Sequence, residues 1–199
     1  SLVGSEMCIR DRNFHHKRGV AKEDILKWKM GYCSSGEYEG RIIVPSFDNT
    51  GRVNYFIARS YNGEWRKYLA PPVSRDLVFN DLYVDWDDDL VIVEGVFDAI
   101  VAGNSVPILG SSLREGSALV RRVVENDTPV YLALDADAEK KALEIIKQFL
   151  EYDVELYKVD IHPYSDVGEM SKEEFLKRKA AALPVDQSFW QRKAIEMLF

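Results

Sequence analysis

Two short apolar runs that each end in carboxylates constrain the fold of this chain more than any other feature. Residues 90–93 and 130–134 are rich in β-branched or aromatic side chains, which is typical of strands buried in a parallel sheet. Glu94 follows the first run, and Asp135 follows the second. Ligands of open α/β sheets bind outside the carboxyl ends of parallel strands. The pattern therefore predicts an acidic site at one edge of a sheet.

Further acids accompany these two in the sequence. Asp137 lies two residues after Asp135, on the same side of an extended chain, and Asp166 follows the last expected strand. Asp98 falls in the first turn of an expected helix, where it can orient the surroundings of Glu94 or accept hydrogen bonds from the helix terminus, rather than contact a metal. Converging carboxylates repel one another without a cation, and oxygen ligands suit magnesium or manganese. We therefore expect two or more divalent ions, held by Glu94, Asp135, Asp137 and Asp166, that act on phosphates.

The region after residue 86 alternates between expected strands and helices. This alternation predicts right-handed βαβ crossovers and a largely parallel sheet. The expected strands are 90–94, 106–109, 129–134 and 154–159, and the expected helices are 97–102, 115–125 and 138–151. A helix capped by Ser171 and a final amphipathic helix over 188–199 follow, with a break at Pro184.

The upstream half predicts a short helix followed by an antiparallel meander. Within residues 18–33, Ile25, Leu26 and Met30 are spaced for one helical face, and Gly31 is the expected stop. Strands over 41–47 and 53–60 flank the sequence DNTG, a strong hairpin signal. A third strand is expected over 65–69 after a turn at Asn62-Gly63.

Composition excludes several classes of protein. The 199 residues are 46% hydrophobic and 30% charged, as expected of a globular chain with a sizeable core. No apolar run approaches the roughly 20 residues of a membrane span and no signal sequence is visible, so we expect a cytoplasmic location and no membrane partner. Neither cysteine belongs to a CxxC pair, which predicts no zinc site in this chain. Residues 1–12, SLVGSEMCIRDR, continue into no periodic pattern, and we interpret them as a non-native scar.

The net charge of −7 argues at first against a nucleic-acid partner, but the charges are unevenly distributed. Basic residues gather in the meander: Arg41, Arg52, Arg59, Arg66 and Lys67. A locally basic surface of this kind binds nucleic acid in a strongly salt-dependent way. Aromatic residues beside it can stack on bases or pack within the meander, and both interpretations stay open: Tyr55, Phe56, Tyr61 and Trp65.

The motifs VIVEGVFDAI and YLALDADA resemble the TOPRIM signature of bacterial-type primases, topoisomerases and some nucleases. The upstream motifs RIIVPSFDNTGRVNYFIAR, RKYLAPP and VFNDLY are similar, in order and spacing, to the catalytic core of bacterial and phage primases. The resemblance covers about residues 18–175. It implies an α/β chain with a basic amino-terminal subdomain (13–85), a Rossmann-like TOPRIM domain with a parallel sheet flanked by helices (86–170) and a helical end (171–199).

The resemblance also implies an activity and its residues. A primase core is a nucleotidyltransferase that uses nucleoside triphosphates to synthesise RNA primers on single-stranded DNA, with a replicative helicase as a further partner. Glu94, Asp135, Asp137 and Asp98 would be catalytic, and Arg41, Arg59, Lys67 and Tyr68 would contact the template or the nucleotide. Primases of this kind usually recognise their start sequence with an amino-terminal zinc-binding domain. The compact core suggests a phage-encoded enzyme, which would act in the host cytoplasm.

Two other functions share the acidic motif. A TOPRIM nuclease would use the same acids to hydrolyse DNA phosphodiesters, but it has no need of Lys67 or of the meander. A non-catalytic TOPRIM module could bind DNA or a replisome partner, but it has no need of a complete set of acids. The upstream half and the intact acids thus favour a primase over both alternatives.

Overall fold

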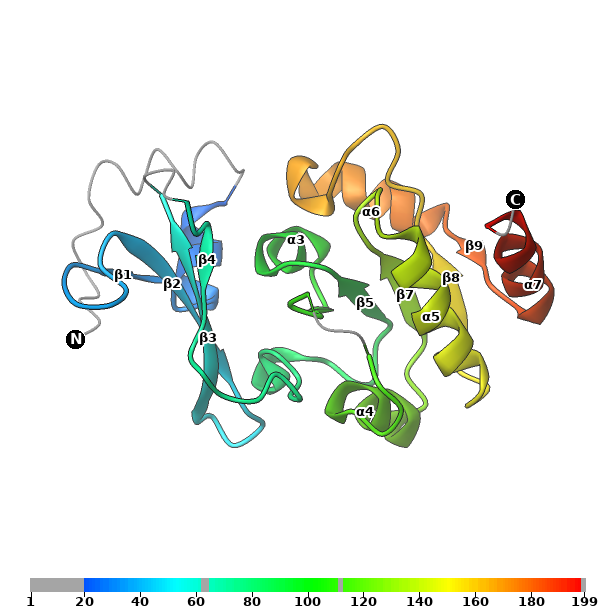
Figure 1. Ribbon diagram of the computed structural model, residues 1–199, viewed down its shortest axis with the longest axis horizontal. Helices are drawn as coiled ribbons and strands as arrows, with labels where there is room; N and C mark the ends of the chain where they lie inside the picture. Colours follow the sequence, from blue (N-terminus) through cyan, green and yellow to red (C-terminus); the bar gives the residue numbers. More distant parts are fainter. Residues whose placement is uncertain (1–19, 62–64, 111–112, 198–199) are drawn as a thin grey trace. The chain divides into compact units, whose positions relative to one another are not determined.

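The computed structural model describes residues 20–61, 65–110 and 113–197, which form two compact units (Figure 1). The first unit contains the described residues of 20–74 together with 79–82. The second contains residues 75–78 and the described residues from 83 onward. The predicted segment 1–12 and the end of the last predicted helix, 198–199, lie outside the described residues.

A four-stranded antiparallel sheet forms the first unit. The predicted strands 41–47 and 53–60 are confirmed, whereas the third is shorter than 65–69 and its predicted turn at Asn62-Gly63 lies outside the described residues. A further short strand, which the sequence did not predict, pairs with the first of these. In spatial order the strands are β1 (Gly31–Cys33), β2 (Arg41–Phe47), β3 (Val53–Ser60) and β4 (Tyr68–Leu69).

The hairpin between β2 and β3 is organised by Asp48, as the DNTG motif predicts. The Asp48 amide donates to the carbonyl of Arg52 at 2.9 Å. One carboxylate oxygen of Asp48 accepts hydrogen bonds from the backbone amides of Thr50 (2.9 Å) and Arg52 (3.0 Å). Gly51 has φ +82°, a conformation that glycine adopts without steric cost. Local side-chain bonds of this kind specify a turn without help from the rest of the fold.

The predicted amino-terminal helix is shorter than expected and presents a different face. Helix α2 spans Lys22–Lys27, and Gly31 begins a strand. Leu26, expected on the buried face, is 76% exposed, so this part of the prediction is wrong. Asp24 and Trp28 are buried instead, four residues apart as helical geometry requires. The Trp28 ring stacks on Phe79 at a centroid distance of 6.4 Å and anchors the helix to the core of the unit.

Residues 79–82 belong to the first unit, and Asn80 attaches them to it by two hydrogen bonds. Its side-chain oxygen accepts from the Phe47 amide at 3.1 Å, and its own amide donates to Ser46 Oγ at 2.9 Å. Asn80 is buried and has φ +58°, a conformation that asparagine adopts more readily than most residues. Asn80 thereby attaches residues 79–82 to the end of β2, and it directly precedes the 3₁₀ turn η1 (Asp81–Tyr83).

A five-stranded sheet forms the centre of the second unit (Figure 1), and the predicted alternation of strands and helices is confirmed. Four neighbouring strands are parallel, and β9 pairs antiparallel with β8 at Pro184, where a break was predicted. The order is β6 (Ser105–Pro107), β5 (Leu90–Val93), β7 (Val130–Ala133), β8 (Leu156–Lys158) and β9 (Leu183–Pro184). All four residues of β5 are fully buried, as expected for a strand covered on both faces.

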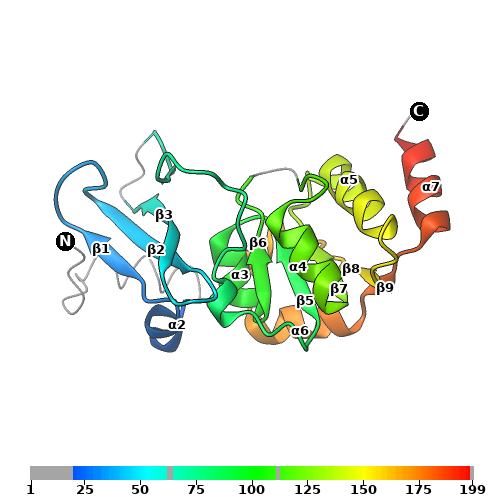
Figure 2. The same ribbon diagram turned by 90° about the horizontal axis from the view of Figure 1, so that it is seen from below.

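Helices cover both faces of this sheet (Figure 2). One face carries α3 (Val96–Ala102) and α6 (Lys172–Ala180), which contact each other, and the other carries α4 (Ala118–Asn126) and α5 (Glu139–Leu150). The predicted cap of α6 is confirmed, because Ser171 Oγ accepts from the Glu174 amide at 3.1 Å. None of the described helices has the length and apolar character needed to cross a membrane.

The last helix, α7 (Gln187–Glu196), packs on α5. Its Trp190 indole donates to the carbonyl of Leu143 at 3.0 Å, while Ile195 is 57% exposed. This bond gives the partly buried indole N–H of Trp190 the acceptor that it needs.

Candidate active site

The acidic site forms where β5 and β7 end. These strands are parallel neighbours, and their last residues, Val93 and Ala133, are paired. Glu94 directly follows β5, and Asp135 follows β7 after one further residue. The Glu94 carbonyl also accepts from the Leu109 amide at 3.1 Å, which joins the exits of β5 and β6.

Asp98 lies in the first turn of α3, and both of its carboxylate oxygens accept hydrogen bonds from backbone amides. Oδ2 accepts from Gly95 at 2.8 Å, and Oδ1 accepts from Gly168 at 2.8 Å. The side chain is buried, and its negative charge lies at the positive end of the α3 dipole. Asp98 thus connects the exit of β5 to the segment that carries Asp166. These contacts agree with the sequence-based alternative in which Asp98 orients the surroundings of Glu94 and accepts hydrogen bonds from the helix terminus. Its catalytic role stays a prediction.

Asp166 precedes a short 3₁₀ helix, η2 (Val167–Glu169), that contacts α3. A hydrogen bond of 3.0 Å from the Ala136 amide to the Ser165 carbonyl holds this segment against the exit of β7. The Oδ1 atom of Asp166 is buried and has no hydrogen-bond partner among the described residues. A buried carboxylate oxygen without a donor is costly, and a cation is one group that removes this cost.

Asp135 is the electrostatic centre of the site. Burial, followed by the charges of Asp98, Glu94, Asp166 and Asp137 in decreasing order, raises the pKa of Asp135 to about 7. We call Asp135 and the four acids whose charges act on it the acidic cluster: Glu94, Asp98, Asp135, Asp137 and Asp166. Such mutual repulsion is typical of sites that bind cations or move protons.

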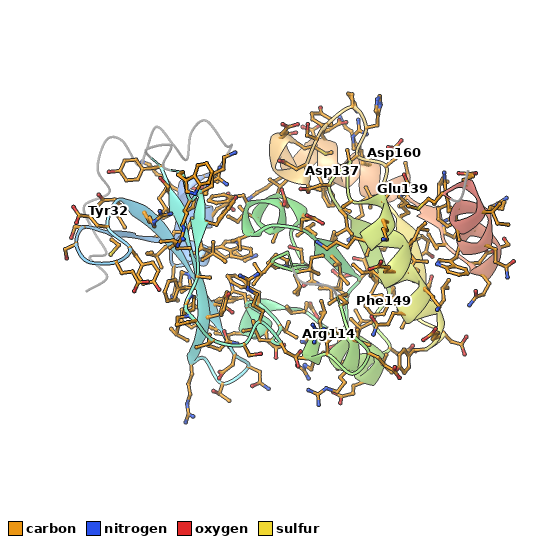
Figure 3. All side chains as sticks on the ribbon, in the orientation of Figure 1. Tyr32, Arg114, Asp137, Glu139, Phe149 and Asp160 are labelled. Atoms are coloured by element: carbon orange, nitrogen blue, oxygen red, sulfur yellow. The ribbon has the colours of Figure 1, made fainter. Side chains whose placement is uncertain are left out.

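The local structure around Asp137 differs from the extended chain that the sequence predicted. Strand β7 ends at Ala133, and Asp137 lies in a turn rather than in an extended chain, so the same-side spacing argument does not apply. Figure 3 shows Asp137 and Glu139 close to the start of α5, whereas Phe149 lies toward its other end. Asp137 is exposed and contributes least to the raised pKa of Asp135. The turn leaves it at the outer margin of the acidic cluster.

A lysine already contacts the acidic cluster. Lys141 Nζ lies 2.9 Å from Glu94 Oε1, with the two side chains 24% and 21% exposed. Within the described part of the chain, no three acidic, histidine or cysteine side chains are arranged to hold a metal ion as they stand. The acidic cluster has the oxygen donors that divalent cations prefer, but its side chains would have to rotate to surround one.

The predicted basic residues belong to the first unit. Arg59 and Tyr68 are direct cross-strand partners on β3 and β4; the Arg59 guanidinium lies 4.4 Å from the centre of the Tyr68 ring and bonds its hydroxyl. Lys67 and Tyr68 are exposed. Arg41 is 4% exposed, and its guanidinium donates to the carbonyl of Arg66 at 2.8 Å. Arg41 therefore lacks the exposure expected of a residue in direct contact with phosphate.

The structure separates the aromatic residues that the sequence left undecided. Tyr55 is 1% exposed, Phe56 packs edge-on against Tyr38, and Tyr61 packs against Tyr32. These are packing roles. Trp65, in contrast, is 97% exposed beside Arg66 and Lys67.

Two residues of the site escaped the sequence interpretation. Lys141 follows Asp135 by six residues. The sequence gave no reason to distinguish it from Lys140, because which of the two lysines faces the acidic cluster depends on the residue at which α5 begins. Gly168 stands where a Cβ atom would lie 2.9 Å from Asp98 Oδ1 and 3.2 Å from Asp166 Oδ1. A glycine two residues after an expected ligand is a weak signal of such close approach.

The solved structures similar to this chain include catalytic domains of DNA primases. The chain superimposes on the catalytic domain of a DnaG primase bound to single-stranded DNA with a TM-score of 0.79, at 18% identity over 96% of this chain and 77% of that one. For the Aquifex aeolicus primase, described by its zinc-binding and RNA polymerase domains, the TM-score is 0.77, with 21% identity over 89% of this chain and 57% of that one. The fold is thus that of a primase catalytic core.

Sequence comparison leads to the same group of proteins. The chain is 25% identical over 173 residues to the DNA primase of Thermotoga maritima. That match covers 78% of this chain and 31% of the relative, so the chain spans about a third of the curated protein's length. No model of a protein family matches the chain. The resemblance to the primase catalytic core that the motifs predicted is confirmed.

Proposed function

We propose that this chain is the catalytic core of a DNA primase, a nucleotidyltransferase that synthesises short RNA primers on a single-stranded DNA template. The observation that carries the proposal is the acidic cluster at the carboxyl ends of β5 and β7, in a fold shared with primase cores. Extending a primer requires a hydroxyl group placed in line with the α-phosphorus of a nucleoside triphosphate, as pyrophosphate leaves. No protein nucleophile is needed for this reaction.

A divalent ion, magnesium or manganese, fits the donors of the acidic cluster. Glu94, Asp135, Asp137 and Asp166 would hold one or more such ions, and the buried, unpartnered Oδ1 of Asp166 supports this assignment. When bound, the ions neutralise the triphosphate and the developing charge on the attacking and leaving oxygens. Asp98 would position this site rather than bind the ion, because its two oxygens accept backbone amides.

The first unit would bind the template and the triphosphate. The Arg59–Tyr68 pair on neighbouring strands, with Lys67 directly before β4, presents cationic and aromatic groups, a combination that suits phosphates and bases. Arg41 would support them indirectly by fixing the carbonyl of Arg66 next to Lys67. A replicative helicase is a further proposed partner, and the cytoplasm, of the host if a phage encodes the chain, is the proposed location. The zinc-dependent start-site recognition of larger primases would require a domain beyond this core.

The test is primer synthesis by the purified chain. The chain is incubated with single-stranded DNA, labelled nucleoside triphosphates and magnesium or manganese, and the products are compared with those of Glu94→Gln. We expect template-dependent oligoribonucleotides that the variant loses. Glu139→Gln is the matched control, because Glu139 is an exposed acid at the start of α5 that pairs with Lys158 at 3.4 Å instead of joining the acidic cluster. Cleavage of the DNA in place of synthesis would establish the nuclease alternative, and DNA binding without either reaction would establish the binding module.

A further inference from the structure

The ion pair between Lys141 and Glu94 joins two distant parts of the chain. Lys141 lies in the first turn of α5, and Glu94 lies at the exit of β5, 47 residues earlier. Lys141 Nζ donates to Glu94 Oε1 at 2.9 Å, and both side chains are largely shielded from water. Shielding makes such a pair stronger than an exposed surface ion pair.

Lys141 lies where the dipole of α5 disfavours a positive charge. The first turn of a helix carries partial positive charge, so a cation there is unfavourable on account of the macrodipole alone. The adjacent Lys140 is exposed, whereas Lys141 is turned into the unit and toward Glu94. The negative charge of the acidic cluster supplies the compensating attraction. Lys141 is thus held in place by the acidic cluster rather than by its own helix.

The acidic cluster gains correspondingly from the lysine. Glu94 is one of the four carboxylates whose charges act on Asp135. An ammonium at Glu94 Oε1 offsets part of this repulsion and fixes the rotamer of Glu94. Lys141 therefore stands where a cation is needed, but it supplies one positive charge on a flexible side chain instead of two on a compact ion.

We propose that Lys141 is a built-in counter-cation of the acidic cluster, which holds Glu94 in position before a divalent ion arrives and releases Glu94 to that ion. The inference rests on the proposed function in one respect: Glu94 must be a ligand of the ion. An ammonium and a divalent cation at one carboxylate repel each other. The lysine therefore lowers the affinity for the ion while it stabilises the ion-free protein.

The test compares Lys141→Met with Lys140→Met in the whole chain. Both variants lose one positive charge from the same turn of α5, but only the first loses the contact with Glu94. Isothermal titration with Mn²⁺ measures affinity, and thermal unfolding in a chelator measures the stability of the ion-free protein. We expect Lys141→Met to bind Mn²⁺ about tenfold more tightly than wild type and to unfold about 3 °C lower without the ion. Lys140→Met should change the affinity by less than about twofold.

Unchanged or weaker Mn²⁺ binding by Lys141→Met would overturn the inference, as would a shift equal to that of Lys140→Met. Titration of Glu94→Gln separates this failure from failure of the proposed function. If wild type binds Mn²⁺ and Glu94→Gln binds it much more weakly, while Lys141→Met gains nothing, the metal site stands and the role of Lys141 does not. If wild type binds no Mn²⁺, or Glu94→Gln binds it as well as wild type does, both proposals fail.

Discussion

Asp98 Oδ1 accepts a hydrogen bond of 2.8 Å from the Gly168 amide, 70 residues later in the chain. The same carboxylate accepts from the Gly95 amide through Oδ2. One buried side chain thus fixes the exit of β5 relative to the segment that presents Asp166. The positions of Glu94 and Asp166 depend on this contact, although neither residue makes it.

Substitution of Asp98 by asparagine should lower stability. The amide group matches the carboxylate in size, but its nitrogen cannot accept a hydrogen bond, so one of the two backbone amides loses its acceptor. We expect a loss of about 1–3 kcal/mol in the free energy of unfolding, measured by urea denaturation without divalent ions. Asp137→Asn removes a charge from the same acidic cluster at an exposed position and should have little effect. Equal stability of the two variants would contradict a structural role for the Asp98 hydrogen bonds.

Addition of one methyl group at residue 168 should disturb the site. In Gly168→Ala the new Cβ would lie 2.9 Å from Asp98 Oδ1 and 3.2 Å from Asp166 Oδ1, and Asp98 cannot retreat without breaking its amide contacts. We expect a loss of about 1–3 kcal/mol in unfolding free energy and weaker Mn²⁺ binding. Gly51→Ala is a useful comparison, because its Cβ meets open space and only the positive φ is penalised. That variant should leave Mn²⁺ binding unchanged.

The stability of the ion-free protein should fall as pH rises from about 4 to about 7. The pKa of Asp135 is raised to about 7 by burial and by its acidic neighbours, so the folded state retains a proton that the unfolded chain releases near the ordinary value of 3.8. Ionisation of Asp135 in the folded state is therefore unfavourable. Asp135→Asn should remove this loss and be more stable than wild type at pH 8, by on the order of 1–3 kcal/mol, with no advantage below pH 4.

Urea denaturation across this pH range in a chelator checks the prediction. The quantity to follow is the difference in unfolding free energy between Asp135→Asn and wild type. A difference that does not vary with pH would show that Asp135 titrates in the folded state as it does in the unfolded chain. Saturating Mn²⁺ should reverse the order of the two proteins, because the ion stabilises only a protein that binds it.

Removal of the exposed indole of Trp65 should weaken binding of single-stranded DNA. Trp65 is 97% exposed beside Arg66 and Lys67, and stacking of a base on an aromatic ring contributes about 1–3 kcal/mol. We expect Trp65→Ala to lose about tenfold or more in affinity with an unchanged salt dependence. Lys67→Met should instead lower the slope of log affinity against log salt by about one. An affinity of Trp65→Ala equal to that of wild type would rule out stacking at this residue.

Features that depend on neighbouring residues were predicted well from the sequence, and features that depend on distant contacts were not. Strands 41–47 and 53–60 and the DNTG hairpin were predicted to the residue, because period-two patterning and the Asp48 turn are local. The three-residue strand β1 was missed, since it is a strand through pairing with β2 rather than through its own pattern. The prediction that Leu26 lies on the buried face of α2 was wrong. The buried side of this helix is set by the contact of Trp28 with Phe79, a residue 51 positions later in the sequence.

The sequence by itself determined that carboxylates end two buried parallel strands, because apolar runs and the acids that follow them are consecutive residues. It thereby determined the acidic cluster and the kind of chemistry to expect there. Tertiary structure alone decided what each acid contacts. Asp98 is engaged by two amides, Glu94 by Lys141, and Asp166 keeps an unpartnered buried oxygen among the described residues. The physical reason is that hydrogen bonds, ion pairs and burial depend on distances between segments that lie tens of residues apart, and no local pattern encodes them.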